Sequence, residues 1–205
     1  MSLGIPREVG RLNNTLTVRR SCRLKLTNRQ QEIIVGSILG DAYIYPQGKI
    51  QFEHSAKQIS YIKWKFAELK SLAYSQPKLI RRKHKLTGKT YSSYRFWLRQ
   101  YFRPWRKIFY PKGHKIFPDY LKLTPLMIAV WYMDDGSFSD HVCTISTESF
   151  STASIFILRK KLRQQYQLPT EVRSNGKIWI RSKDHKKFAL LIKKHLHKSM
   201  LYKLP

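Results

Sequence analysis

The chain has 205 residues, which is enough for one domain or for two small fused domains. Its 40 Lys and Arg residues against 12 Asp and Glu residues give a formal net charge of +28, which predicts a polyanionic partner, with nucleic acid as the first candidate. No apolar run approaches the roughly 18 residues of a membrane span, and no single basic amphipathic helix gathers the aromatic residues, so a membrane protein is not indicated.

The cysteine and histidine content excludes several further classes. Cys22 and Cys143 form neither a disulfide framework nor a zinc-ligand spacing, and the seven histidines are scattered. A zinc-finger or HNH-type nuclease is therefore not supported, and a reducing, intracellular setting is expected.

Residues 1–24 show no periodicity and are predicted to be a basic N-terminal arm. The segment is either a flexible arm that lies on phosphates or the remnant of a transit-like leader, and its composition does not decide between them. Its basic residues are Arg7, Arg11, Arg19, Arg20 and Arg23.

Two apolar stretches, residues 32–42 and 125–136, are each predicted to be a buried helix that ends on an aspartate, Asp41 or Asp135. An acidic residue at the C-terminal end of a helix has the wrong charge for the helix dipole. The ordinary interpretation is two core helices with solvated carboxylates, or aspartates that cap the following hairpins. Two such placements in one basic chain favour a bound cation instead.

Similar elements follow each predicted motif helix. In the first half, the motif helix begins at a Thr27–Gln30 capping box. It is followed by a hairpin over 43–54, a helix from Ser55 to about 73, and two basic strands on either side of a turn at 86–89. In the second half, a hairpin spans 136–147, Ser149 or Ser151 caps a helix through 162, a hairpin spans 171–181, and a helix covers 184–195.

The spacing indicates an internal duplication. Asp41 and Ser55 are 14 residues apart, as are Asp135 and Ser149. The two halves are therefore predicted to be copies related by a pseudo-two-fold axis between the motif helices, with Asp41 and Asp135 close together. Two adjacent carboxylates are costly to ionise unless a divalent cation offsets them, and an oxygen-only site suits Mg²⁺ and phosphodiester hydrolysis.

The motifs resemble those of the LAGLIDADG homing endonucleases, in the single-chain form that carries two motifs. The resemblance rests on residues 36–44 and 123–136, on 51–54 and on the terminal 200–205, and it covers nearly the whole chain. It implies an α+β fold of two pseudo-symmetric αββαββα halves, 25–120 and 121–205, whose saddle-shaped antiparallel sheets lie in the DNA major groove. The second motif departs from the family pattern at Val130 and Asp134, and Ala42 replaces the final glycine of the first.

The resemblance also implies residue roles. Asp41 and Asp135 match catalytic residues that bind Mg²⁺ or Mn²⁺, one for each DNA strand, and Lys115 and Lys203 match basic residues that flank the metals. Gln51 matches a polar catalytic position. The metal-site candidates also include Gly40 and Asp134, although Asp134 fits a supporting role better than that of a ligand.

The implied function is a monomeric, site-specific endonuclease that leaves 3′ overhangs at a long double-stranded DNA target and promotes intron mobility, most often in an organelle. The alternatives are an RNA-binding maturase that assists splicing of its intron and a catalytically silent DNA-binding protein; intact Asp41 and Asp135 argue against the silent protein. Basic and polar side chains on the strands are expected to contact bases and phosphates. These candidates are Lys49, Gln51, Arg81, Arg82, Lys83, Lys85, Arg95, Arg99, Arg173, Lys177 and Arg181.

Overall fold

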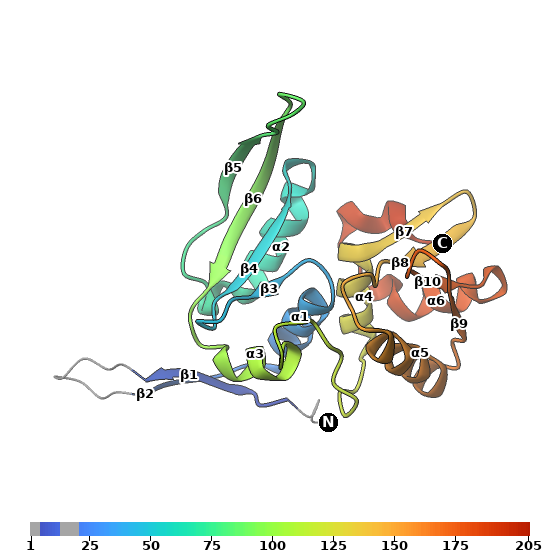
Figure 1. Ribbon diagram of the computed structural model, residues 1–205, viewed down its shortest axis with the longest axis horizontal. Coiled ribbons are helices and arrows are strands. Elements are labelled where there is room, and N and C mark those ends of the chain that lie inside the picture. Colours follow the sequence, from blue (N-terminus) through green and yellow to red (C-terminus); the bar gives the residue numbers. More distant parts are fainter. Residues whose placement is uncertain (1–4, 13–20) are drawn as a thin grey trace.

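Two four-stranded antiparallel sheets lie on either side of a central pair of helices (Figure 1). The computed structural model describes residues 5–12 and 21–205. The first half contains α1 (Asn28–Leu39), β3 (Tyr43–Ile44), β4 (Ile50–Ser55), α2 (Ile59–Leu69), β5 (Lys78–Lys83), β6 (Thr90–Leu98) and α3 (Arg103–Phe109). The second half contains α4 (Pro125–Asp135), β7 (Gly136–Ser139), β8 (Val142–Ile145), α5 (Thr152–Tyr166), β9 (Thr170–Val172), β10 (Ile178–Ile180) and α6 (His185–Ile192).

The strand orders show that the two halves repeat one topology. The first sheet has the strand order β3-β4-β6-β5 and the second has β7-β8-β10-β9. In each sheet, therefore, the second strand of the first hairpin pairs with the second strand of the second hairpin. This confirms the α+β fold with two pseudo-symmetric halves. The boundaries at 24/25 and 120/121 stay a prediction.

Short 3₁₀ helices extend or connect these elements. They are η1 (Ala56–Gln58), η2 (Lys70–Leu72), η3 (Ser182–Asp184), η4 (Lys193–His195) and η5 (Lys198–Lys203). None of the helices in the described part of the chain is both long and apolar enough to cross a membrane.

The helix starts follow the predicted capping residues, with one difference between the halves. Thr27 and Gln30 form the reciprocal capping box of α1. Ser55 accepts a hydrogen bond from the amide of Lys57 at the start of η1. In the second half Ser151, not Ser149, accepts the amide of Ser154. The equal 14-residue spacing therefore does not end on equivalent caps, because the second cap lies two residues later.

The basic N-terminal segment contains strands that the sequence does not predict. β1 (Glu8–Leu12) pairs antiparallel with β2 (Ser21–Lys25). The preceding residues are attached to the core, since Gln31 donates a hydrogen bond to the Ile5 carbonyl at 2.9 Å and Trp105 donates to the Pro6 carbonyl at 3.0 Å. The absence of periodicity in 1–24 gave no indication of these strands, and the assignment of the segment as a basic arm stays a prediction. Arg19 and Arg20 lie outside the described residues, as do the side chains of Arg11 and Arg23.

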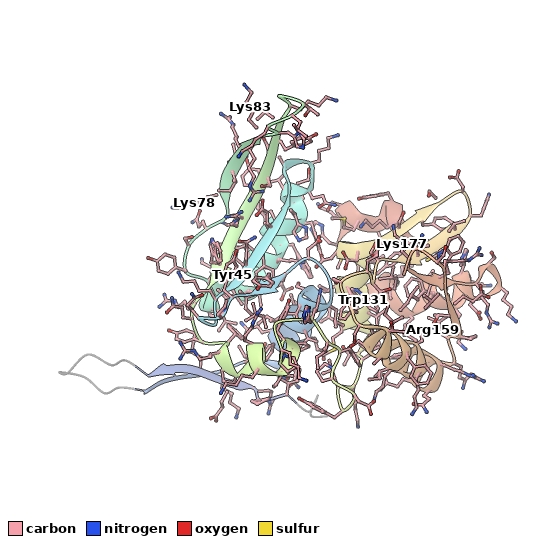
Figure 2. The ribbon with its side chains drawn as sticks, in the orientation of Figure 1. Tyr45, Lys78, Lys83, Trp131, Arg159 and Lys177 are labelled. Atoms are coloured by element: carbon pink, nitrogen blue, oxygen red, sulfur yellow. The ribbon has the colours of Figure 1, made fainter. Side chains whose placement is uncertain are left out.

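Helices α1 and α4 pack tightly because Gly36 of α1 and its C-cap residue Gly40 face larger residues of α4. A Cβ atom at Gly36 would lie 2.7 Å from the Met127 carbonyl oxygen and 2.8 Å from the Val130 Cβ. A Cβ atom at Gly40 would lie 2.4 Å from the Asp134 Cβ. The glycines thus provide the space that the larger residues of the second motif occupy. Trp131, buried in the same helix, lies between the two sheets in Figure 2.

Candidate active site

Each motif helix ends beside a lysine that binds its last carbonyl groups. The Lys115 Nζ donates to the carbonyl oxygens of Leu39 and Gly40 at 2.9 and 2.8 Å. The Lys203 Nζ donates to those of Met133 and Asp134 at 2.7 and 3.3 Å. These carbonyls occupy equivalent positions in the two motifs, so the two lysines repeat one arrangement. Each ammonium group offsets the negative end of a helix dipole.

The aspartates at these helix ends share one electrostatic site. Burial, followed by the charge of Asp134, raises the pKa of Asp41 to about 6. Burial and the charges of Asp41 and Asp134 raise the pKa of Asp135 to about 7. Burial lowers the pKa of Lys115 to about 8 although the aspartates oppose that shift, and burial also lowers the pKa of Lys203. The Asp41 charge is one cause of the raised pKa of Asp135, and the predicted closeness of the two carboxylates stays a prediction.

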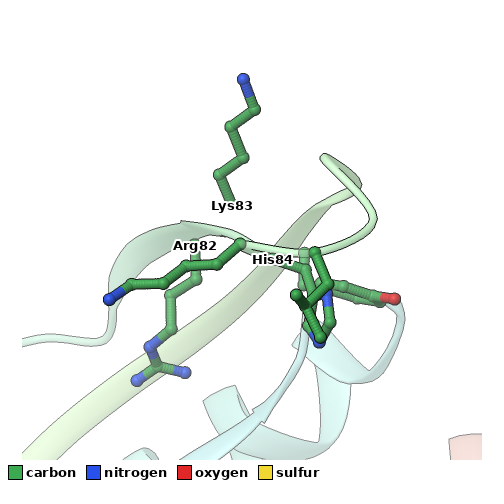
Figure 3. A pocket seen from close by; sticks show the side chains of 6 residues that line it. Arg82, Lys83 and His84 are labelled. Carbon is green, nitrogen blue, oxygen red and sulfur yellow. The ribbon is translucent and has the colours of Figure 1, made fainter.

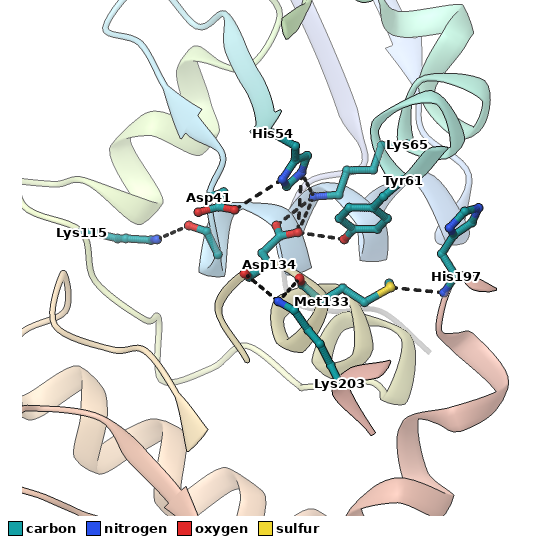
Figure 4. A network of polar contacts seen from close by, with 10 residues as sticks. Asp41, His54, Tyr61, Lys65, Lys115, Met133, Asp134, His197 and Lys203 are labelled. Carbon is teal, nitrogen blue, oxygen red and sulfur yellow. Dashed lines mark hydrogen bonds and ion pairs between the residues drawn. The ribbon is translucent and has the colours of Figure 1, made fainter. Parts of the chain in front are cut away.

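Asp134 belongs to a buried polar network instead of facing solvent (Figure 4). Its side chain is fully enclosed, and so is that of Lys65. The Lys65 Nζ donates to Asp134 Oδ1 and Oδ2 at 2.7 and 2.8 Å, and the Tyr61 hydroxyl donates to Oδ1 at 2.8 Å. These donors occupy both carboxylate oxygens. The geometry therefore favours the supporting role over that of a metal ligand for Asp134.

His54 connects this network to Asp41. Burial and the neighbouring Lys65 charge lower the pKa of His54 to about 3, so its ring is neutral at ordinary pH. The Lys65 Nζ lies 3.1 Å from His54 Nε2, and an ammonium group can only donate, so Nε2 accepts and the ring proton is on Nδ1. His54 Nδ1 lies 3.5 Å from Asp41 Oδ2. The fixed tautomer thus directs a donor toward the Asp41 carboxylate.

The sequence interpretation missed His54, Tyr61 and Lys65 as parts of this site. Tyr61, Lys65 and Leu69 are four residues apart and are all buried, so they form one stripe of α2. A lysine within an apolar stripe is a signal for a buried ion pair, and Asp134 is one of two charged residues, with Asp135, in the otherwise apolar α4. Those two signals together could have identified the pair.

The candidate cation site includes three oxygen- or nitrogen-bearing side chains within 4.8 Å of one another: Asp41, His54 and Asp134. His54 and Asp134 already bind Lys65, which leaves Asp41 as the member with the most accessible ligand atoms. Gly40, also predicted at the metal, has its carbonyl oxygen hydrogen-bonded to Lys115. That Asp41 and Asp135 together hold a divalent cation stays a prediction, and carboxylate oxygens are suitable ligands for such a cation.

The comparisons with known proteins identify the family and the fold. The sequence profile of the LAGLIDADG DNA endonuclease family matches residues 31–190, which include both motifs. The chain belongs to the LAGLIDADG DNA endonuclease family. A solved structure of the homing endonuclease I-WcaI bound to its DNA recognition sequence superposes with a TM-score of 0.79 at 27% identity, covering 89% of this chain and 88% of that one. A structure of I-DmoI variants, at 13% identity and a TM-score of 0.51, shares the fold.

Curated relatives fall into two groups. The first is represented by Protein RecA of Mycobacterium shimoidei, 28% identical over 223 residues, of which the match covers 96% of this chain and 51% of that protein. The chain thus spans about half the length of these relatives. The second includes the probable intron-encoded endonuclease 1 of Wickerhamomyces canadensis, 28% identical with 87% and 85% coverage, and the cytochrome b mRNA maturase bI2 of Debaryomyces hansenii, 24% identical with 87% and 74% coverage.

In this LAGLIDADG chain the sheet face opposite α2 carries a band of polar side chains. Gln51 on β4 pairs with Trp97 on β6, and Glu53 pairs with Arg95. Gln51 accepts a hydrogen bond from the Tyr45 hydroxyl and donates one to Glu53, both at 3.2 Å. The Arg95 guanidinium lies 5.7 Å from the Trp97 ring centre. Gln51 therefore lies in a network on this face, and its predicted catalytic role stays a prediction.

Strand alternation separates the basic residues of β5. Arg82 pairs with Tyr91 and shares the face of Arg95, whereas Arg81 and Lys83 point to the opposite side. Figure 3 shows Lys83 and Arg82 leaving the strand in opposite directions, at the edge of an open hollow of about 700 Å³ at the hairpin tip. The predicted DNA contacts in the first half therefore cannot all lie on one surface. Lys85 lines the hollow, Lys49 is exposed, and the Arg99 Nε lies 3.4 Å from the Ala73 carbonyl.

The second sheet has a comparable outer face. Trp179 on β10 pairs with Thr144 and Glu171, and the Arg173 guanidinium lies 3.9 Å from its ring centre. Lys177 and Arg181 are each two residues from Trp179, so their side chains point to the same side of the sheet as Trp179. The Lys177 Nζ is 3.8 Å from Glu148, and Arg181 donates to Asp184 at 3.1 Å. The structure thus brings the second-half candidates together on one face.

Proposed function

We propose that the chain is a site-specific DNA endonuclease that hydrolyses one phosphodiester in each strand of a double-stranded target. The observation that carries this proposal is the duplicated helix end: two motif aspartates with raised pKa values, each following a helix whose last carbonyls bind a lysine. Membership of the LAGLIDADG DNA endonuclease family and the similarity to the DNA-bound I-WcaI structure support it.

The donor set fits Mg²⁺ or Mn²⁺ at Asp41 and Asp135. Both carboxylates are partly buried, and burial together with the neighbouring Asp134 charge raises their pKa values. A divalent cation would offset that charge, and carboxylate oxygens are its preferred ligands. When bound there, such a cation supplies an activated water and stabilises the leaving oxygen of a phosphodiester. Gly40 and Asp134 have their contacts with Lys115 and Lys65, so we place them beside the cation and not in its ligand shell.

The remaining work falls to the chain's own residues. His54 faces Asp41, with Nδ1 3.5 Å from Asp41 Oδ2, and helps to orient that carboxylate. Lys115 and Lys203 each use two N–H groups on helix carbonyls, which leaves one donor for a phosphate oxygen. Their lowered pKa values make these ammonium groups better proton donors than ordinary lysines. Gln51 is assigned to contacts near the first strand that is cut.

The two outer sheet faces are proposed to read DNA in the major groove. The residues assigned to bases are those that share the faces of Trp97 and Trp179, and those at the β5–β6 tip or on its opposite side are assigned to phosphates. The base-facing set is Lys49, Gln51, Arg82, Arg95, Arg99, Arg173, Lys177 and Arg181, and the phosphate set is Arg81, Lys83 and Lys85. Cleavage with 3′ overhangs, promotion of intron mobility, a monomeric state and an organellar location belong to the same proposal.

A second candidate is an RNA-binding maturase that assists intron splicing. The match to the cytochrome b mRNA maturase bI2 of Debaryomyces hansenii over 87% of this chain favours it. Such an activity would need the basic surface and not the aspartates. It therefore predicts that substituting Asp41 and Asp135 leaves function intact.

The deciding experiment uses a plasmid library that carries a long randomised duplex insert. Wild-type protein with Mg²⁺ should linearise a subset of plasmids, EDTA should prevent this, and sequencing of the ends gives the target and the overhang. Asp41→Asn and Asp135→Asn should each abolish linearisation while DNA binding persists. The matched control is Asp140→Asn, at an exposed turn residue with φ of 49°, which should cleave normally. No cleavage together with tight binding to intron RNA would replace the endonuclease by the maturase.

A further inference from the structure

Glu53 is an acidic residue at the centre of a surface that is otherwise basic. It lies on β4 with a side chain that is 16% exposed. The Arg82 guanidinium donates to its two carboxylate oxygens at 2.6 and 3.1 Å. Arg95 donates at 2.7 Å from the paired position on β6, and the Ser93 hydroxyl donates at 2.6 Å. One carboxylate therefore connects three strands of the first sheet.

The carboxylate is ionised under all ordinary conditions. Burial opposes ionisation, but the hydrogen bonds from Arg82, Ser93 and Arg95 outweigh it and lower the pKa of Glu53 to about 2. Both arginines therefore carry a permanent partner before any nucleic acid arrives. Two arginines with one carboxylate present a smaller positive charge to DNA than two free arginines would.

Neither affinity nor stability explains this arrangement well. A carboxylate on a DNA-facing sheet repels phosphates and so weakens binding to any sequence. Ion pairs between partly exposed side chains add little to folding stability, because solvent screens them and ordering long side chains costs entropy. What the arrangement does provide is a fixed geometry, since Arg95 is held between Glu53 and the Trp97 ring. An arginine reads guanine with two parallel hydrogen bonds only when its guanidinium is correctly oriented.

We infer that Glu53 is a specificity-determining positioning residue: it holds Arg82 and Arg95 in the orientation that reads bases and prevents them from binding phosphates of arbitrary sequence. This inference depends on the proposed DNA binding. It assigns the function to the first sheet alone, so the second half of the target should be read independently of Glu53.

The test substitutes Glu53→Gln, which keeps the side-chain shape and removes the charge. Binding to a random-sequence duplex is measured from 50 to 200 mM salt. Freeing two arginines should steepen the slope of log affinity against log salt by up to about 1.8, which corresponds to an additional loss of about tenfold over that range. Selection from a randomised duplex library should then give weaker base preferences in one half of the target. The loss of discrimination between the preferred base pair and the others should be roughly 5- to 150-fold for each base pair that the arginines read.

Two matched control variants each remove one negative charge at a position away from Glu53. Glu68→Gln breaks the Arg29–Glu68 pair, in which two hydrogen bonds of 2.8 and 2.5 Å join α1 and α2 away from the sheet face. Glu148→Gln removes the loose 3.8 Å contact with Lys177 on the second half. Neither should alter the base preferences of the first half. If Glu53→Gln does not fold, Glu53→Asp keeps the charge on a shorter stem and should give an intermediate salt slope.

The outcomes separate this inference from the proposed function. A wild-type protein without DNA affinity contradicts the proposed function itself. A wild-type protein that binds its target, with a Glu53→Gln variant whose salt slope and base preferences match those of Glu68→Gln, overturns the inference alone. Equal weakening of target and random DNA, with unchanged slope, also overturns it, because that result indicates a purely structural residue.

Discussion

Substituting Lys65→Met should strongly destabilise the protein at neutral pH. The change removes the ammonium group and leaves the fully enclosed Asp134 carboxylate with Tyr61 as its remaining strong donor. Breaking a buried ion pair in this way costs about 3–5 kcal/mol. In the variant, a proton on this carboxyl group would limit the loss of folding free energy. Protonating an ordinary carboxyl at pH 7 costs about 4 kcal/mol, because the cost is about 1.36 kcal/mol for each pH unit above its usual pKa. The cost relative to wild type should therefore fall to about 1.5 kcal/mol at pH 5.

Urea unfolding of both proteins at pH 5 and pH 7 measures this difference. At pH 7 the melting temperature should also fall by on the order of 6–20 °C for a chain of this size. The double variant Lys65→Met with Asp134→Asn should regain most of the loss, because no buried charge remains. Glu68→Gln, which breaks a surface pair, should cost about 1 kcal/mol or less. A loss for Lys65→Met that is below 1 kcal/mol, or that is the same at both pH values, would refute the reasoning.

Three further outcomes test the helix interface and the carboxylates. Gly36→Ala should cost about 1–3 kcal/mol of stability in urea unfolding, because the new Cβ would lie 2.7 Å from a backbone carbonyl oxygen. Ser37→Ala on the same helix is the control and should be near neutral, because the buried Ser37 hydroxyl has no partner among the described residues. Tyr61→Phe should cost about 1 kcal/mol, since Lys65 still neutralises Asp134. Asp41→Asn should gain stability relative to metal-free wild type as the pH rises from about 4 to 7. The reason is that the folded wild-type carboxyl, with a pKa of about 6, holds its proton more tightly than the unfolded chain does, so ionising it costs folding free energy. A difference in unfolding free energy between the two proteins that is the same at about pH 4.5 and about pH 7.5 in EDTA would contradict the raised pKa.

Local patterns predict much of this fold because they report on contacts that are near in sequence. The Thr27 capping box, the hairpins and the apolar motif helices all depend on neighbours within a few residues. The duplication extends this to the pair of halves, since the same elements recur in the same order. The motif helices carry the aspartates of the candidate site, so the spacing also indicates where those residues lie.

The remaining features depend on partners that are distant in sequence. Asp134 and Lys65 are 69 residues apart, and their pairing depends on how α4 and α2 are both placed against α1. β1 and β2 are short strands without alternation in a basic segment, so no local pattern indicates them. The separation of Arg81 from Arg82 is different, because strand alternation alone predicts it once the bounds of β5 are set.

The pseudo-two-fold relation explains which features of the site are duplicated and which are not. Lys115 and Lys203 contact equivalent carbonyls, because both helix ends need a cation. Gly40 and Asp134 occupy equivalent positions that face each other across the helix pair, where a Cβ on Gly40 would lie 2.4 Å from that of Asp134. That position can therefore hold one side chain and not two. The single buried carboxylate needs one buried cation, and Lys65 of the first half provides it. His54 contacts both Lys65 and Asp41, and this contact belongs to the first half, so the carboxylates of Asp41 and Asp135 should differ in how firmly they are held.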